Sequence, residues 1–360
     1  MKTNMLSTRK KNPVSKLLIV GCSGILLTLL MSLTVPTIAF DEQSTLTPTP
    51  ESPLTHNTVF GVAFSPDGTQ ILTGSREGIA RLWDVNTGEV VRTFKDRDNY
   101  TVGAKFSSDG KYVFTNSEAS YLVDDGIVRM WDANTGEEIH TFEGRNPVLW
   151  PDGSFLLTDR AGVPARLWDV NTGEVVQSFD HSFVGATISP DGKYVLAGNY
   201  PQIMEKIKLW DISKDQVVFE FPAVPPEVKV DTASASGGLA FSPDGTHTLI
   251  NGGLGYLVLW DMQSLQPLAS LSGISPGSVV FSPDGQSFAT VAENGSVQVW
   301  NVDMKNMIRE FTSSDNSAIR DFAFSPDGTL FLTANTADLI QLWNIETGAE
   351  LKQYQIEVPA

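Results

Sequence analysis

The sequence predicts an all-β protein built from copies of one unit, and three observations lead to this prediction. A turn motif of the form Phe-Ser-Pro-Asp-Gly first stands at residues 64–68 and returns along the chain. Short stretches between the turns alternate apolar and polar residues, which is the period of a half-buried strand. Aligned tryptophans recur with gaps of 48, 37, 42, 50, 40 and 43 residues, at Trp83, Trp131, Trp168, Trp210, Trp260, Trp300 and Trp343.

The Ser-Pro-Asp-Gly segment predicts the turn of a β-hairpin. Its proline presets φ for the first central position of a type I turn, and its glycine accepts the left-handed conformation that follows. Close copies stand at residues 241–245, 281–285 and 324–328, and looser copies at 106–110, 149–153 and 188–192. Seven turns therefore accompany seven tryptophans.

A second turn follows several of the tryptophans. Asn-Thr-Gly stands at residues 86–88, 134–136 and 171–173, and Glu-Thr-Gly at 346–348. With two hairpins, each repeat holds four antiparallel strands, called a, b, c and d, of which c carries the tryptophan. One such sheet cannot bury both faces alone. Repeats in the low forties thus predict a seven-bladed β-propeller of four-stranded antiparallel blades, over residues 58–356.

The repeats resemble those of the WD-repeat β-propeller family over roughly residues 58–355. The dipeptide Trp-Asp is complete in five copies, and Trp300 and Trp343 are followed by asparagine instead. We interpret the five aspartates as structural groups that hydrogen-bond the neighbouring turn rather than as a catalytic ring; they are Asp84, Asp132, Asp169, Asp211 and Asp261.

Two features depart from the family pattern. The family's buried network of histidine, serine, aspartate and tryptophan is mostly missing: His56, Ser75 and Trp83 fit in blade one, but Glu77 replaces the aspartate. The family also uses an N-terminal strand to complete its last blade, whereas seven d strands can be counted here without one. We therefore expect the ring to close by packing of blade seven against blade one, at the weakest seam.

Residues 1–39 predict an export signal. A basic stretch is followed by an apolar run at 17–35 and by Thr37 and Ala39, which fit the small-residue rule of signal cleavage. Retention as an N-terminal membrane anchor and lipidation at Cys22 remain alternatives. Residues 40–57, rich in Pro, Ser and Thr, predict an extended tether. Each alternative places the propeller outside the cytoplasm, secreted or anchored to the cell envelope.

Charge and cysteine content narrow the function. The formal net charge is −17, and Cys22 is the single cysteine. Nucleic acid and anionic membranes are therefore disfavoured partners, and we expect membrane contact only through the N-terminal segment. No disulfide or thiol chemistry is expected in the propeller, which we expect to be monomeric.

Three other patterns in the sequence do not indicate a chemical site. Residues 273–277 read Gly-Ile-Ser-Pro-Gly, but a hydrolase elbow needs a backbone N–H after the serine, which proline lacks, so we expect a d-to-a loop. The four histidines occupy unrelated places in the repeat, which disfavours a shared metal site. Asp124 and Asp125 are weak evidence for calcium without a spaced ligand loop. We expect no cofactor, no metal and no catalysis.

Insertions predict the binding face. The b-to-c and d-to-a connections emerge on one face, the top face, and hold almost all length variation, at residues 116–126, 198–206 and 221–238. Such insertions usually mark the binding face of a repeat protein. The aromatic and acidic residues of these loops form the predicted partner-binding site: Tyr100, Tyr121, Asp124, Asp125, Tyr200 and Glu205.

Two functions follow from these features. The first is a non-catalytic, exported propeller that binds a protein or peptide through its top face as a scaffold or sensor, which is what the family resemblance implies. The second is an extracytoplasmic carbohydrate-binding module or a hydrolytic or lyase enzyme that uses the central mouth. Glycosidic chemistry would require paired carboxylates converging on the axis.

Overall fold

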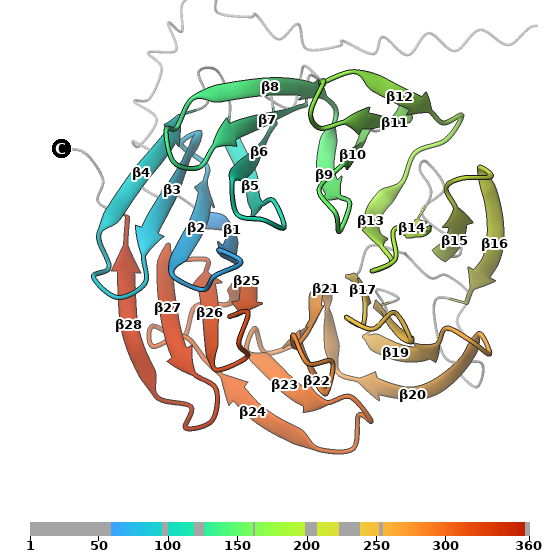
Figure 1. The fold of residues 1–360 in the computed structure, drawn as a ribbon. Helices are drawn as coiled ribbons and strands as arrows, with labels where there is room; N and C mark the ends of the chain where they lie inside the picture. The colour runs from blue at the N-terminus through green and yellow to red at the C-terminus, as the bar shows by residue number, and fades with distance from the viewer. Residues whose placement is uncertain are drawn as a thin grey trace, which may run out of the picture. The chain divides into compact units, whose positions relative to one another are not determined.

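A computed structural model describes residues 59–95, 100–118, 126–160, 163–198, 207–222, 238–251 and 255–356. In these residues 28 strands form seven four-stranded antiparallel sheets around a central axis (Figure 1). The predicted signal, tether and His56 lie outside the described residues. Each sheet runs a-b-c-d in strand order, with the a strand nearest the axis and the d strand outermost. The predicted seven-bladed propeller is confirmed.

The strands of blades one to four follow the predicted order. Blade one holds β1 (Val59–Phe64), β2 (Gln70–Ser75), β3 (Ile79–Asp84) and β4 (Val90–Lys95). Blade two holds β5 (Tyr100–Phe106), β6 (Tyr112–Glu118), β7 (Ile127–Asp132) and β8 (Glu138–Glu143). Blade three holds β9 (Arg145–Leu149), β10 (Phe155–Arg160), β11 (Val163–Asp169) and β12 (Val175–Ser178). Blade four holds β13 (Val184–Ile188), β14 (Tyr194–Gly198), β15 (Ile207–Asp211) and β16 (Gln216–Phe221).

Blades five to seven repeat the arrangement. Blade five holds β17 (Leu239–Phe241), β18 (His247–Asn251), β19 (Tyr256–Asp261) and β20 (Gln266–Ser272). Blade six holds β21 (Ile274–Phe281), β22 (Ser287–Ala292), β23 (Val297–Asn301) and β24 (Met307–Phe311). Blade seven holds β25 (Ile319–Phe324), β26 (Leu330–Asn335), β27 (Leu339–Asn344) and β28 (Glu350–Gln355).

One local expectation was wrong. The segment 273–277, expected as a loop, contributes to β21, because only Gly273, with φ of 77°, separates β20 from β21. The pairing of β21 with β22 shifts register between Ile274 and Val279, so the proline falls in an irregular stretch that needs no ladder N–H from it. The side-chain amide of Asn251 donates to the carbonyl of Ser275 at 2.8 Å.

We define the bottom face as the face that carries the a-to-b and c-to-d turns. Each of these turns is held by hydrogen bonds among its own polar groups. In the first, the Ser65 hydroxyl donates to Asp67 at 2.6 Å, and Gly68 takes φ of 71°. In the second, Asp84 accepts hydrogen bonds from the backbone N–H groups of Asn86 and Thr87. The Asp84 carboxylate thus shapes the c-to-d turn, as expected from the sequence.

Each tryptophan lies at a seam between blades. An aromatic ring from the d strand of one blade packs against the tryptophan of the next, with centroid distances of 5.9 Å for Phe94–Trp131, 5.7 Å for Phe142–Trp168, 5.1 Å for Phe221–Trp260 and 5.5 Å for Phe311–Trp343. Between blades three and four, Phe183 and His181 contact Trp210. Leu271 takes the aromatic's place between blades five and six, beside Trp300.

The ring closes with this same contact. Tyr354 of β28 lies edge-on to Trp83 of blade one at 5.9 Å, and its hydroxyl donates to the carbonyl of Val85 at 3.1 Å. On the inner side, the carboxylates of Asp321 and Asp338 accept backbone N–H groups of β1. All four described strands of blade seven come from the C-terminal part of the chain, so blade-to-blade packing closes the ring.

A second contact crosses four of the seams. Arg92 of β4 donates to the carbonyl of Thr135 at 2.8 Å, in the c-to-d turn of the next blade. The same d-strand position holds His140, Arg309 and Lys352, which bond the turn carbonyls of Asn171, Glu346 and Asn86. Each of these side chains also lies over the left-handed glycine of the turn that it bonds: Gly136, Gly173, Gly348 and Gly88.

We expect Tyr354→Phe to lower the free energy of unfolding by about 1 kcal/mol, because it removes one buried hydrogen bond and keeps the ring. Tyr354→Ala should cost roughly 3–5 kcal/mol, since it also opens a cavity against Trp83. Urea unfolding followed by tryptophan fluorescence measures both, with Phe94→Ala as the matched change at another seam. A Tyr354→Ala cost below 1 kcal/mol would show that this contact does not close the ring.

Candidate functional site

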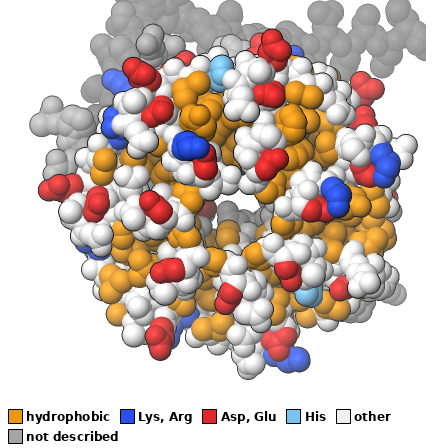
Figure 2. All heavy atoms as spheres, viewed as in Figure 1, with side chains coloured by type: hydrophobic (Ala, Val, Ile, Leu, Met, Phe, Trp, Pro, Cys, Tyr) orange, Lys and Arg blue, Asp and Glu red, His pale blue; other side chains and the backbone are white. Residues whose placement is uncertain are grey.

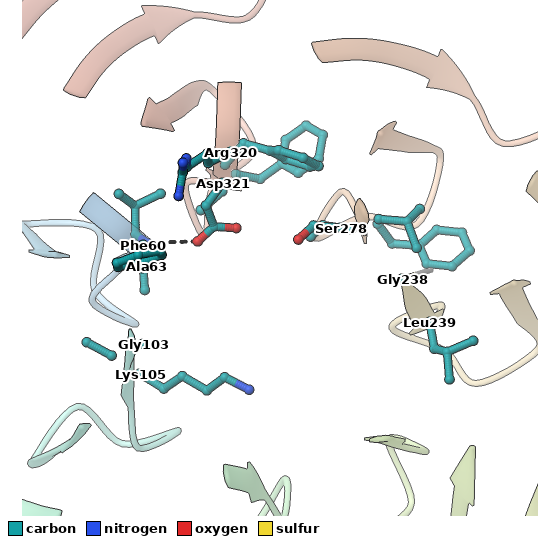
Figure 3. Close-up of a pocket in the computed structure, with 18 of the residues that line it drawn as sticks. Phe60, Ala63, Gly103, Lys105, Gly238, Leu239, Ser278, Arg320 and Asp321 are labelled. Carbon is teal, nitrogen blue, oxygen red and sulfur yellow. Dashed lines mark hydrogen bonds between the residues drawn. The ribbon is translucent and has the colours of Figure 1, made fainter. Parts of the chain in front are cut away.

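The central channel holds the main cavity among the described residues. Its volume is about 560 Å³, and strands β1, β5, β17, β21 and β25 line it. Figure 2 shows the channel opening at the centre of the propeller, and Figure 3 shows the side chains that line it. The position three residues before the end of each a strand is small in most blades, as at Gly61, Gly103, Gly238 and Ser278. In blade seven this position is Asp321.

Asp321 is a carboxylate at the channel wall. Its Oδ2 accepts the N–H of Val62 in the neighbouring blade at 2.8 Å. A Cβ at Gly61 would lie 3.3 Å from the Cα of Gly103, so the glycine lets β1 and β5 approach closely beside this bond. Burial raises the pKa of Asp321 to about 6, against the opposing effects of hydrogen bonds from the Val62 and Phe322 N–H groups and of the Lys105 charge. One carboxylate thus joins two blades and faces the channel.

Lys105 of β5 projects its ammonium group into the same channel (Figure 3). It donates to the carbonyl of Pro147 in blade three at 3.0 Å. The side chain is open to the channel but surrounded by its walls, and this burial lowers the pKa of Lys105, while Asp321 acts in the opposite direction. Two N–H donors of the ammonium remain after the bond to Pro147.

A second cation borders the cavity. Arg320 is exposed, and its guanidinium lies 5.3 Å from the ring centroid of Phe60. Ser278 of β21 directs its hydroxyl into the channel (Figure 3). The cavity lining therefore carries two cationic groups and one carboxylate among the described residues, together with an otherwise apolar wall.

Another buried carboxylate lies in blade three. Asp159 of β10 accepts a hydrogen bond from the Asn146 amide at 2.9 Å. Burial raises the pKa of Asp159 to about 6, while the bond from Asn146 and the charge of Arg145 lower it. Among the described residues, no group of histidine, cysteine and acidic side chains could hold a metal ion.

The sequence compares with one known family. The model "WD domain, G-beta repeat" matches residues 49–84, 88–132, 265–301 and 305–344. These four matches are in phase with the tryptophan repeat, and the structure completes them to seven blades. The chain contains WD repeats and folds as a seven-bladed β-propeller. No curated protein matches it.

Members of the WD-repeat family commonly serve as protein-interaction scaffolds. The stretch without a match, between residues 132 and 265, contains the blades that depart most from the repeat. There Trp150 replaces the turn serine, and it is buried against Phe155 and beside Gly192 of the next blade.

Of the predicted partner-binding residues, the structure describes only the backbone of Tyr100, which lies in a strand and not in the expected loop. Tyr100 begins β5, and the position of its side chain lies outside the described part of the chain. Tyr121, Asp124, Asp125, Tyr200 and Glu205 also lie outside the described residues. Their role as a binding site stays a prediction.

The buried polar network differs from the one sought in the sequence. Ser75 is not the partner of Trp83: the indole N–H donates to Thr73 at 3.0 Å, and corresponding bonds join Trp131 to Thr115 and Trp343 to Thr333. Ser75 instead donates to the carbonyl of Ile79. A sequence signal was present, because a threonine stands ten residues before the tryptophan in blades one, three and seven, where the bond forms. In blade six, which also has this threonine, the indole of Trp300 donates to Gln298 instead.

Blade seven carries a substitute network. The Asn335 amide donates to Ser313 at 2.7 Å and to Asp315 at 2.9 Å, and Ser313 donates to Gln341 at 2.9 Å. Gln341 also donates to Glu350 at 2.7 Å. These groups form a polar network in place of the missing histidine and aspartate. Their residue types did not indicate this network in the sequence.

The pH dependence of stability tests the Asp321 environment. A folded-state pKa of about 6, above the usual 3.8, means that the folded protein holds this proton more tightly than the unfolded chain. Stability from this group is therefore present below pH 4 and is lost as the pH rises to 6.

Relative to Asp321→Asn, which does not titrate, the parent should lose melting temperature between pH 4 and pH 6. Thermal melts of both proteins across this range isolate Asp321 from Asp159, which titrates in both. Ser278→Ala, a change at the same level of the channel, should leave the parent's profile unchanged. A pH-independent difference between the parent and Asp321→Asn would contradict the assigned environment.

Proposed function

We propose that this WD-repeat propeller is a non-catalytic platform outside the cytoplasm that binds a protein or peptide through its top face. The observation that supports the proposal is that the two faces of the propeller differ in their connections. On the bottom face, each turn aspartate is bonded within its own turn, as Asp67 is by Ser65 and Thr69. Those bonds lower the pKa of Asp67, the Ser65 hydroxyl most of all.

The opposite face carries the length variation of the repeat. Its connections hold the insertions at residues 116–126, 198–206 and 221–238, whereas the bottom turns keep nearly constant length. Length variation is tolerated where no fixed hydrogen-bond pattern is needed, and binding residues gather there. Aromatic residues with polar neighbours, such as Tyr121 beside Asp124 and Asp125, suit protein recognition.

The location is argued from the N-terminal sequence. The basic stretch and apolar run of residues 1–39 support export, with cleavage, retention as an anchor and lipidation at Cys22 as the three alternatives. Among the residues that the structure describes, no helix is long and apolar enough to cross a membrane.

The enzyme alternative is less favoured by the channel. Glycosidic chemistry uses two carboxyl groups on either side of the bond that breaks. Among the described residues that line the cavity, Asp321 is the one carboxylate, and its Oδ2 already accepts a backbone hydrogen bond.

A crosslinking pull-down from envelope material tests the platform. We expect the parent to capture a specific protein, and a variant with Tyr121, Asp124, Asp125 and Tyr200 changed to alanine to lose it. The matched control changes three exposed bottom-face residues, Glu89, Glu137 and Glu174, to alanine and should retain the partner. Loss of capture in the bottom-face control, or capture that survives the top-face changes in a folded protein, would refute the assigned face.

A further inference from the structure

Two levels of the channel each carry one charged residue where the other blades have uncharged ones. The residue that precedes the last residue of each a strand is uncharged in six blades, as at Ala63, Val148 and Ala323, and is Lys105 in blade two. Two residues earlier, Asp321 is the acid of its level. A propeller closes with small side chains at these levels, so a lysine there calls for a separate reason.

Contacts within the protein do not satisfy all the hydrogen-bond donors and the charge of Lys105. Its one hydrogen bond goes to the carbonyl of Pro147, and no carboxylate of the described residues lies within ion-pair distance of its ammonium. Asp321, the nearest candidate by its electrostatic effect, is committed to the N–H groups of Val62 and Phe322. The ammonium is open to the channel and has no counter-charge there, so an anion that enters the channel could bind beside it.

Other groups around the cavity fit the same ligand. The Ser278 hydroxyl has no hydrogen-bond partner among the described residues. It points into the channel from the wall across from Lys105 (Figure 3). Arg320 borders the cavity with its guanidinium over the face of Phe60, a contact that leaves the N–H edge of the guanidinium available. The lining thus has a local excess of positive charge in a protein with a formal net charge of −17.

We propose that the channel is a binding site for a ligand with a single carboxylate, which Lys105 and Ser278 hold and which Arg320 attracts at the cavity border. The volume of about 560 Å³ admits a small organic acid or the last few residues of a peptide chain. Asp321 disfavours a second negative charge, so a monocarboxylate binds better than a dicarboxylate or phosphate. The apolar wall accepts the remainder of the ligand.

This site goes beyond the proposed platform and does not depend on it. A free organic acid could occupy the channel with no protein on the top face, and a partner's C-terminal carboxylate could enter it as part of top-face binding. The chemistry at Lys105 is the same in both cases.

Calorimetric titration of the full chain tests the proposal. The probes are propionate, N-acetyl-trialanine with a free C-terminal carboxylate, the same peptide as its amide, and inorganic phosphate. We expect the carboxylate peptide or propionate to bind, and the amide and phosphate to bind more weakly. Tighter binding of the peptide than of propionate identifies a chain end as the source, and equal binding identifies a free acid.

Variants locate the site. Lys105→Met keeps the length of the stem and should weaken carboxylate binding by about tenfold or more, as expected for loss of a charge-assisted hydrogen bond. Lys105→Arg should retain binding. The control is Lys111→Met, because Lys111 is an exposed lysine of the same blade, paired with Asp109 outside the channel. Equal binding of the acid and the amide, or full affinity in Lys105→Met, would overturn the proposal.

A footprint on the unchanged chain keeps the test valid if Lys105→Met does not fold. An amine-reactive reagent should modify Lys105 more slowly when the carboxylate peptide or propionate is present, while Lys111 reacts at the same rate. Unchanged modification of Lys105 at saturating probe would also overturn the proposal. The platform is judged separately, because capture of a partner by Lys105→Met would leave the top-face function standing without this site.

Discussion

The propeller depends on a contact between the tryptophan of one blade and the last strand of the blade before it. A four-stranded sheet has two apolar faces, and the tryptophan supplies a large plate that a single blade cannot cover. Phe94 against Trp131 and Phe311 against Trp343 are ordinary examples. Tyr354 against Trp83 is the closing one, and it adds a hydroxyl where the other seams have only a ring or an aliphatic group. The ring therefore needs no borrowed strand among the described residues.

The turns and the seams are coupled through this geometry. Where a c-to-d turn ends in glycine, as at Gly88 and Gly136, the preceding blade presents a long polar side chain that lies over it and bonds the turn. Blades four, five and six have no such glycine, and the preceding d strands place Gln177, Phe219 and Ala269 at that position. There Asp215, Leu265 and Met304 take the left-handed conformation themselves. The turns of the bottom face thus contribute to the contacts that close the ring.

Repetition explains what could be predicted from the sequence. Turns, strand ends and the closing blade follow from local motifs, because a turn or a periodic strand marks each boundary. Single residues that depart from the repeat were harder. Asp321 and Lys105 differ from their counterparts in the other blades, but a hydrogen bond to Val62 or Pro147 crosses a seam that only the assembled ring creates. The loop predicted at 273–277 was wrong, because the strand period around the proline is a stronger signal there than the proline itself.

We propose that the seams and bottom turns hold the ring, while the channel and the top face bind ligands. Amide hydrogen exchange of the full chain, alone and in the presence of the captured partner, tests it most directly. We expect new protection in residues 116–126, 198–206 and 221–238 and in the channel strands β5 and β25, with the c-to-d turns unchanged. Protection confined to the c-to-d turns and outer d strands would contradict it.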